Sequence, residues 1–180
     1  MFEVLRKTDC PVVTINGTQL TVKNEVKYLG LILDQKLTRR PHITVKKTQI
    51  NLRLRQMNWF IGRKSKLTIE NQLLLYEAII KPIWSYGIQL WGCAKPSNTQ
   101  IIQRIQSKTL RILFNAPWYV SNKTLHKDSR IPFVEDEIIR MTNRYLLNLT
   151  GHSNEQVNQL HVPSEARRRL HRQWPTDVLQ

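Results

Sequence analysis

The sequence predicts an α+β fold that is mainly helical, and three observations lead to this class. Residues 11–34 are rich in β-branched side chains and contain an Asn-Gly pair, the strongest short signal for a β-hairpin. From Thr38 onward, apolar residues recur at the spacing of an α-helix in several successive segments. Residues 152–180 are polar and weakly periodic, which predicts a flexible C-terminal tail.

The N-terminal segment is predicted to be β structure. Strands are expected at 11–15 and 18–22, joined by the Asn-Gly pair. The segment 25–34 alternates charged and apolar residues at its start and then becomes almost continuously apolar, which predicts one strand that enters a core. Gly30 within this strand indicates a bulge or a close approach of backbone.

The first helix is expected after Pro41 and is predicted to end near Gly62. Its apolar stripe consists of Ile43, Ile50, Leu54 and Met57. Thr68 is a candidate N-cap for the second helix, because its hydroxyl can accept a hydrogen bond from the first turn. Pro82 is expected to end or kink that helix.

Two further helices are predicted beyond an aromatic connector. The connector, residues 82–96, is expected to be rich in turns, and Ser97 can cap the third helix after it. Ala-Pro-Trp at 116–118 is expected to end this helix. The fourth helix is predicted to open near Pro132, with acidic residues in its first turn that complement the helix dipole. Its predicted apolar stripe is Ile138, Met141, Tyr145 and Leu149.

The net charge gives the first indication of function. The chain has 28 Lys and Arg against 13 Asp and Glu, a formal charge of +15. A polyanion relieves the self-repulsion of such a chain, and a nucleic acid is favoured over an anionic membrane and over a solvated basic surface with no partner. The sequence has no apolar run of roughly eighteen residues and no signal-peptide pattern, so no membrane partner is expected. The expected location is intracellular, in the nucleus, the cytoplasm or both.

Ten positive charges lie between Asp34 and Glu70, and this acid-free segment (residues 35–69) holds no carboxylate. They are Lys36, Arg39, Arg40, Lys46, Lys47, Arg53, Arg55, Arg63, Lys64 and Lys66. Contact with nucleic-acid phosphates is the favoured interpretation, the alternative being a solvated face whose acids come from elsewhere in the fold. Arg104, Lys108 and Arg111 share one face of the third helix, and for them both interpretations stay open.

Aromatic residues lie close to these basic segments. They are Trp59, Trp84, Tyr86, Trp91 and Trp118. Such rings can stack on unpaired bases, but packing in a core is the favoured interpretation. For the basic cluster at 167–172 three interpretations stay open: a nucleic-acid-binding tail, an import signal and a solvated run of charge.

Residues that could carry catalysis are sparse. Cys10 and Cys93 lack a CxxC partner and a histidine at ligand spacing, which predicts free thiols and no zinc site. The sequence shows no catalytic triad and no Gly-rich phosphate-binding motif. Two-metal phosphoryl transfer requires converging carboxylates, and no strand-borne Asp-Asp pair is present. The residues alone therefore predict a nucleic-acid-binding chain without an active site.

Several blocks of the sequence resemble one family over roughly residues 10–145. The segment 26–34, followed by Leu37-Thr38 and His42-Ile43, resembles the region after the catalytic palm in reverse transcriptases of non-LTR retrotransposons. Further blocks resemble the jockey group of these mobile elements, namely 59–67, 75–76, 80–84, 86–92, 103–104, 106–112 and 115–122.

The resemblance implies a division of the chain into four parts. Residues 1–37 would be the end of a polymerase palm with its strands, and 38–122 would be a helical thumb. Residues 123–151 would add a C-terminal helix, and 152–180 would be a polar, partly disordered basic tail. In this family the thumb holds the template–primer duplex, so the basic residues named above would contact RNA, DNA or an RNA–DNA hybrid.

The resemblance also implies a primer grip at Lys27, Tyr28, Leu29 and Gly30. In the family this β-hairpin presses the 3′ end of the primer toward the catalytic metal ions. Gly30 would then let the backbone approach the primer closely.

The chain departs from the family in what it lacks. The catalytic carboxylates of the family lie upstream, on an Ala-Asp-Asp turn that is absent here, and Arg39 stands where relatives commonly have Trp. The chain alone is therefore predicted to be catalytically inactive and to need no cofactor, with Mg²⁺ expected only for the complete polymerase. The missing palm and fingers are possible partners.

Three interpretations stay open at this point. The favoured one is a C-terminal fragment of a reverse transcriptase, and the alternatives are a stand-alone nucleic-acid-binding module and a non-functional transposon relic. Exposed apolar surface on residues 26–33 would favour the fragment, because a strand removed from its sheet leaves an unpaired edge. A charged and covered edge would favour the module.

Overall fold

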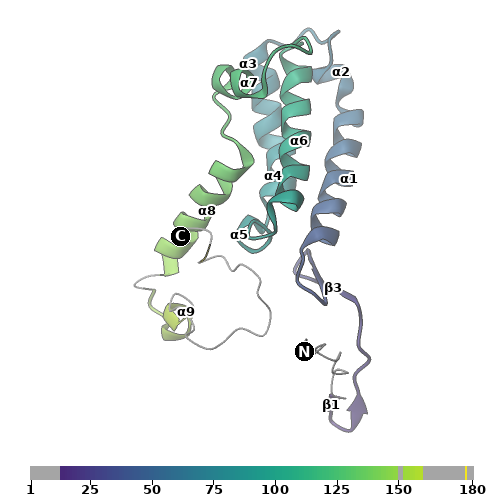
Figure 1. Cartoon of the computed structure of the whole chain (residues 1–180), viewed down its shortest axis with the longest axis vertical. Helices are drawn as coiled ribbons and strands as arrows, with labels where there is room; N and C mark the ends of the chain where they lie inside the picture. Colours follow the sequence, from purple (N-terminus) through teal and green to yellow (C-terminus); the bar gives the residue numbers. More distant parts are fainter. Residues whose placement is uncertain (1–12, 150–151, 160–176, 178–180) are drawn as a thin grey trace, which may run out of the picture.

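The computed structural model describes residues 13–149, 152–159 and 177, and it consists of two small β-hairpins followed by an elongated bundle of helices (Figure 1). This confirms the mainly helical α+β class. Cys10, the first residues of the expected 11–15 strand and the basic cluster at 167–172 lie outside the described residues.

The first predicted hairpin is present but shorter than expected. Strands β1 (Thr14–Ile15) and β2 (Thr18–Gln19) pair antiparallel. Asn16 and Gly17 between them have φ values of 50° and 77°, so both lie in the left-handed region. This is the turn geometry for which Asn-Gly is preferred, because its twist matches that of the two strands.

The segment 25–34 forms a second hairpin, so the prediction of one strand entering a core is wrong. Strands β3 (Glu25–Tyr28) and β4 (Leu31–Asp34) pair antiparallel around a turn at Leu29-Gly30. Both turn residues have positive φ, 45° and 78°, and this conformation is uncommon for a leucine. Gly30 therefore lies in a tight turn and not in a bulge. The hairpin expected here from the family resemblance is present.

The predicted stripe of the first helix is confirmed, but the helix ends earlier than expected. In α1 (Arg40–Gln56), Ile43 and Ile50 are buried and Leu54 is partly buried. The backbone leaves the helix at buried Met57, with φ −95° and ψ 4°. A separate short helix, α2 (Asn58–Ile61), then carries the chain to Gly62.

The second predicted helix continues through Pro82. It consists of α3 (Ile69–Leu75), a π-helical turn η1 (Tyr76–Ile80) and α4 (Lys81–Ser85). Thr68 caps α3 as predicted, because its hydroxyl accepts a hydrogen bond from the backbone of Asn71 at 3.4 Å. Pro82 lies in the first turn of α4, and the π-helical turn before it provides the wider backbone that its ring requires.

The aromatic connector has the predicted turns, at 86–87 and 92–93, but the segments between them form short helices that the sequence did not indicate. After α4, the chain reverses at Gly87, with φ 65°, and enters α5 (Ile88–Trp91). Trp84 and Trp91 are each only 2% exposed, so they pack in the core as predicted. Helix α6 (Pro96–Leu113) then begins at Pro96 with Lys95 at its N-cap, so the predicted cap from Ser97 is not formed.

The C-terminal part contains two helices that sequence reasoning missed, at 122–129 and at 155–159, the second of them within the expected flexible tail. Helix α7 (Asn122–Ser129) is capped by Ser121, and it is followed by α8 (Val134–Leu149) and α9 (Glu155–Gln159). The start of α8 near Pro132 is confirmed. The predicted stripe is confirmed at Ile138 and Leu149 and packs partly at Met141, but Tyr145 is 37% exposed. The hydrophobic residues buried in α8 are Val134, Ile138, Leu146 and Leu149.

The core lies among α1, the α3–α4 segment, α6 and the first half of α8. A buried polar contact crosses it, because the amide of Gln106 donates to the Tyr76 hydroxyl at 3.1 Å and to the Pro132 carbonyl at 3.1 Å. The pKa of Tyr76 is raised to about 12, and burial is the largest of several causes. This contact ties α6 to the π-helical turn and to the start of α8.

Gly87→Ala tests how tightly the α4–α5 turn is packed. A Cβ at this position would lie 2.6 Å from a methyl carbon of Leu31, in a backbone conformation that alanine disfavours. We expect a loss of about 1–3 kcal/mol in the free energy of unfolding, measured by urea denaturation. The double variant with Leu31→Ala should lose less than the sum of the single variants, because the collision is removed. Strict additivity would show that Gly87 is not in contact with Leu31.

Candidate nucleic-acid interface

The start of α1 is held by Asp34 at the end of β4. Its carboxylate accepts hydrogen bonds from the backbone and hydroxyl of Thr38 and from the backbone of Arg39, each at 2.9 Å. Burial alone would raise the pKa of Asp34, but these hydrogen bonds prevail and lower it. Asp34 thus orders Thr38 and Arg39, the two residues before α1, which is a structural role for the last acid before the acid-free segment.

Arg39 connects this helix start to the connector. Its guanidinium donates to the carbonyls of Leu90 at 3.1 Å and Leu37 at 3.0 Å, and Asn98 donates to the carbonyl of Thr38 at 3.2 Å. The β4–α1 junction is therefore fixed to α5 and α6. Lys36 and Arg40 extend from this junction and are exposed.

The predicted primer-grip residues lie beside α1. The hydroxyl of Tyr86 donates to the carbonyl of Leu29 at 2.6 Å, and the Tyr86 ring lies directly beneath Gly30. The Lys46 ammonium of α1 is placed over the same ring, 5.3 Å from its centroid. Burial lowers the pKa of Lys46, and the nearby charge of Lys27 lowers it further. The fold thus brings Lys27 and the Leu29-Gly30 turn next to Lys46, although they are far apart in sequence.

His42 lies beneath this cluster and is only 2% exposed. Its Nδ1 accepts a hydrogen bond from the backbone of Ile32 at 3.3 Å, so the proton of the neutral ring is on Nε2. Burial lowers the pKa of His42 to about 4, with a further contribution from Lys46. The ring is therefore neutral at pH 7 and joins β4 to α1.

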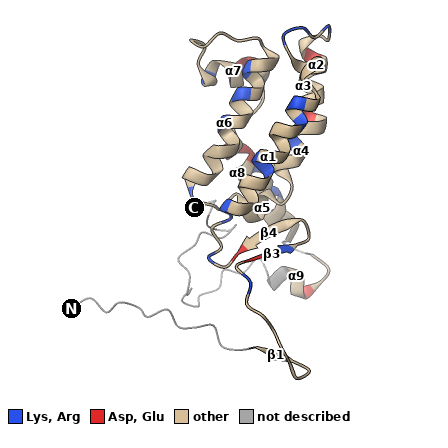
Figure 2. Cartoon of the chain, turned by 90° about the vertical axis from the view of Figure 1, so that its right-hand side faces the viewer, with Lys and Arg blue, Asp and Glu red and all other residues tan. Residues whose placement is uncertain are grey.

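The cations of α1 form two rows on either side of its buried stripe. Lys46 and Arg53 are seven residues apart and lie on one side, while Lys47 and Arg55 lie toward the other. Figure 2 shows Lys and Arg along α1 and in the loop after α2, and no acidic residue on this helix. Among the described residues, no carboxylate lies within ion-pair distance of these α1 side chains.

The second row meets α6 at a surface hollow of about 370 Å³. Arg55 and Asn58 contribute from the end of α1 and the start of α2, and Lys108 and Ile112 contribute from α6. The fold therefore brings Lys108, singled out in the sequence, next to the acid-free segment. Arg104 is exposed one turn earlier on α6.

Arg111 makes contacts that the sequence did not indicate. Its guanidinium donates to the Pro117 carbonyl at 2.6 Å, to the Val120 carbonyl at 2.9 Å and to the Asn122 side chain at 3.0 Å. These bonds hold the loop between α6 and α7. Its predicted role at a phosphate stays a prediction.

The last group of predicted cations forms the loop between α2 and α3. Arg63, Lys64 and Lys66 are all exposed there.

Of the aromatic residues, Trp59 is 70% exposed, Trp118 is 90% exposed and Tyr86 is 51% exposed, so the prediction of core packing is wrong for these three. A tryptophan at a helix end carries no sequence signal that separates a core position from a surface position.

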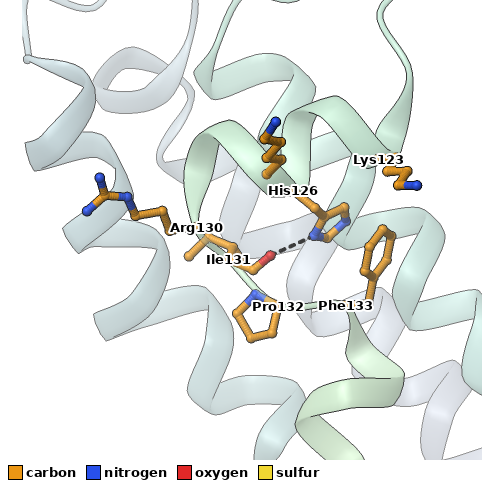
Figure 3. A pocket seen from close by; sticks show the side chains of 7 residues that line it. Lys123, His126, Arg130, Ile131, Pro132 and Phe133 are labelled. Carbon is orange, nitrogen blue, oxygen red and sulfur yellow. Dashed lines mark hydrogen bonds between the residues drawn. The ribbon is translucent and has the colours of Figure 1, made fainter.

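A separate hollow of about 440 Å³ lies at α7, where three cations that the sequence did not single out line its rim (Figure 3). They are Lys123, Lys127 and Arg130. The His126 ring stacks on Phe133 with centroids 3.9 Å apart, and its Nδ1 donates to the Ile131 carbonyl at 2.9 Å. Nε2 then accepts from the amide of Gln103 at 3.0 Å, so His126 joins α7 to α6 through Nε2 and to the segment before α8 through Nδ1.

Within the described residues, no group of three or more His, Cys, Asp or Glu side chains is placed to hold a metal ion. In the same part of the chain, no helix combines the length and apolar character that crossing a membrane requires.

Comparison with known proteins finds relatives over almost the whole chain. The RNA-directed DNA polymerase from mobile element jockey of Drosophila funebris is 37% identical over 179 residues, which covers 95% of this chain and 20% of the relative. Probable RNA-directed DNA polymerases of two Drosophila melanogaster transposons, X-element and BS, are 36% and 37% identical over 99% and 92% of this chain. No family model and no solved structure matches.

These relatives are RNA-directed DNA polymerases, or reverse transcriptases, of mobile elements. The chain belongs to the non-LTR retrotransposon branch of this family, and the resemblance to the jockey group is confirmed. It spans about one fifth of the length of these relatives.

His42 predicts how stability depends on pH. The ring has a pKa of about 4 in the folded chain against 6.5 as the ordinary value, so the unfolded chain binds the proton more readily between these values. Stability should therefore fall as the pH is lowered from about 6.5 toward 4, by up to about 1.4 kcal/mol per pH unit from this residue.

His42→Asn isolates this contribution, because the Asn oxygen can accept the bond from Ile32 but does not titrate. Urea unfolding at pH 7.0 and about pH 4.5 measures the difference. We expect a smaller loss in the variant than in the unsubstituted chain. An equal loss in both would show that His42 is not the titrating group.

Proposed function

We propose that this chain is the part of a reverse transcriptase that holds the template–primer duplex, with the helical bundle acting as its thumb. The observation that carries the proposal is the acid-free face of α1, on which cations flank the core stripe without a carboxylate partner. Phosphate groups neutralise such cations and release condensed counterions, which favours binding. The family relationship supports this function, since the relatives are named as RNA-directed DNA polymerases.

The turn at Leu29-Gly30 supports a contact with the primer. The tip of the hairpin projects beside Lys46, and Tyr28 and Leu29 on it are 63% and 71% exposed. Tyr86 fixes the backbone of this turn from below through the Leu29 carbonyl. A rigid turn with cations on both sides suits the close approach to a sugar–phosphate backbone that a primer grip requires.

The open face of the β3–β4 hairpin favours a fragment over a self-sufficient module. The register places Val26 opposite Leu33 on one face, and these side chains are 50% and 39% exposed. A two-stranded sheet with exposed apolar residues and free edges is marginal by itself. We therefore propose that this face packs against further polymerase sequence, such as the palm.

In this proposal the chain binds nucleic acid, and upstream sequence supplies the catalytic carboxylates and their Mg²⁺. The purified chain should therefore incorporate no deoxynucleotide on a primed RNA template. Primer extension followed by gel electrophoresis measures this. Extension that co-purifies with the chain, and that is lost when the chain is depleted by an affinity tag, would overturn the proposed division of roles.

A salt titration tests the proposed phosphate contacts. Fluorescence anisotropy with a labelled RNA–DNA hybrid should show that the logarithm of the association constant falls linearly with the logarithm of the salt concentration. Replacing Lys47, Arg53 and Arg55 by Gln should reduce this slope by about 0.9 for each phosphate contact that is lost. Gln has a helix propensity similar to those of Lys and Arg, so α1 should remain folded.

The matched control removes the same charge from the α7 hollow by replacing Lys123, Lys127 and Arg130 with Gln. This variant should keep the slope of the unsubstituted chain. A flat salt dependence of the unsubstituted chain would exclude phosphate binding. An equal reduction in both triple variants would show that net charge matters and that the α1 face has no special role.

A further inference from the structure

One end of the bundle exposes aromatic rings beyond the proposed duplex-binding face. Trp118 is 90% exposed and Tyr119 is 71% exposed in the loop between α6 and α7, and Trp59 on α2 is 70% exposed. Burial of such rings is favourable in free energy, and rings that face water do not gain it. Their exposure in two separate segments therefore indicates a partner.

The two segments belong to the same end of the molecule. Asn58, beside Trp59, lines the same hollow as Ile112 near the end of α6. Both views of the chain place α2 and the α6–α7 loop at one end of the bundle (Figures 1 and 2). We call this region, comprising Trp59, the loop 114–121 and the loop 62–68, the bundle tip.

The exposed rings stand on fixed backbone. Arg111 holds the α6–α7 loop through the carbonyls on both sides of Trp118 and Tyr119, at Pro117 and Val120. The Trp59 ring stacks on half-buried Phe60, with centroids 3.4 Å apart. The rings are therefore presented to solvent by anchored segments, which lowers the entropic cost of binding a partner.

The bundle tip also carries cations. Arg63, Lys64 and Lys66 are exposed in its loop 62–68, and Arg55 and Lys108 line the same hollow as Asn58, the neighbour of Trp59. None of the three loop cations has a described carboxylate within ion-pair distance. Aromatic faces beside unneutralised cations suit a base and its phosphate, whereas an apolar protein surface would leave these charges unpaired.

We propose that the bundle tip binds unpaired nucleotides, with bases stacked on Trp118 and Trp59 and phosphates beside Arg63, Lys64 and Lys66. This deepens the proposed function, on which it rests. It assigns single-stranded nucleic acid to the tip and duplex to the α1 face. A chain that holds a template–primer duplex then also holds an unpaired extension of that duplex.

The test compares two probes with the full chain. One is a blunt RNA–DNA hybrid, and the other is the same hybrid with an unpaired RNA extension of eight nucleotides. The unsubstituted chain should bind the extended probe more tightly than the blunt one. Trp118→Ala should weaken binding of the extended probe roughly tenfold, as expected for one stacked base, and leave binding of the blunt probe unchanged.

Two controls separate stacking from other causes. Trp118→Phe should retain most of the affinity for the extended probe, because it keeps an aromatic face, whereas Trp118→Leu should behave like the alanine variant. Since Trp118 is 90% exposed, these substitutions should leave the circular dichroism spectrum unchanged. Quenching of tryptophan fluorescence by the extension should decrease in Trp118→Phe.

The outcomes distinguish this inference from the proposed function. If the Trp118→Ala and Trp59→Ala variants both bind the extended probe like the unsubstituted chain, the bundle tip does not bind bases. In that case, binding of the blunt probe still supports the proposed function. Equal retention by the Leu and Phe variants would also overturn stacking and indicate an apolar contact, as with a protein partner. If neither probe binds at all, the proposed function itself fails.

Discussion

The left-handed turn at Gly87 is the constraint on which the arrangement of the charged surface depends. It reverses the chain between α4 and α5, so that Trp84 and Trp91 both enter the core and the methyl groups of Leu31 pack on the glycine. Tyr86, the preceding residue, then meets the β3–β4 turn from below. A Cβ at residue 87 would lie 2.6 Å from a methyl carbon of Leu31, so this side chain would have to shift, and the left-handed backbone would be strained.

Two acidic residues of the chain have partners within the fold and do not neutralise α1. The carboxylate of Asp34 accepts hydrogen bonds from the backbone of Thr38 and Arg39, just before α1. Glu137 is 1% exposed and binds Arg140 at 2.6 Å and Lys81 at 3.6 Å. Burial alone would raise the pKa of Glu137, but the hydrogen bond from Arg140 and the charge of Lys81 prevail and lower it. This carboxylate therefore joins α8 to α4 and does not reach the α1 face.

Much of this arrangement follows from the sequence where a local pattern has one structural solution. The stripe of Ile43 and Ile50, the Asn-Gly turn and the acidic start of α8 are of this kind, and each is present in the structure. The turn at Leu29-Gly30 was missed from the residues alone because leucine rarely adopts positive φ, and tertiary contact with Tyr86 stabilises it here. The exposure of Trp118 depends on Arg111 and the loop it holds, a contact between residues that no periodic pattern connects.

The position of bound nucleic acid on the chain distinguishes the α1 face from the hollow at α7. Backbone and arginine side-chain NMR signals of the isotope-labelled chain, followed during titration with a short RNA–DNA hybrid, report which surface it contacts. The account predicts that the perturbed signals cluster on α1 around Lys47 and Arg53 and on the Leu29-Gly30 turn. Perturbations confined to the hollow around Lys127, with the α1 signals unchanged, would contradict it.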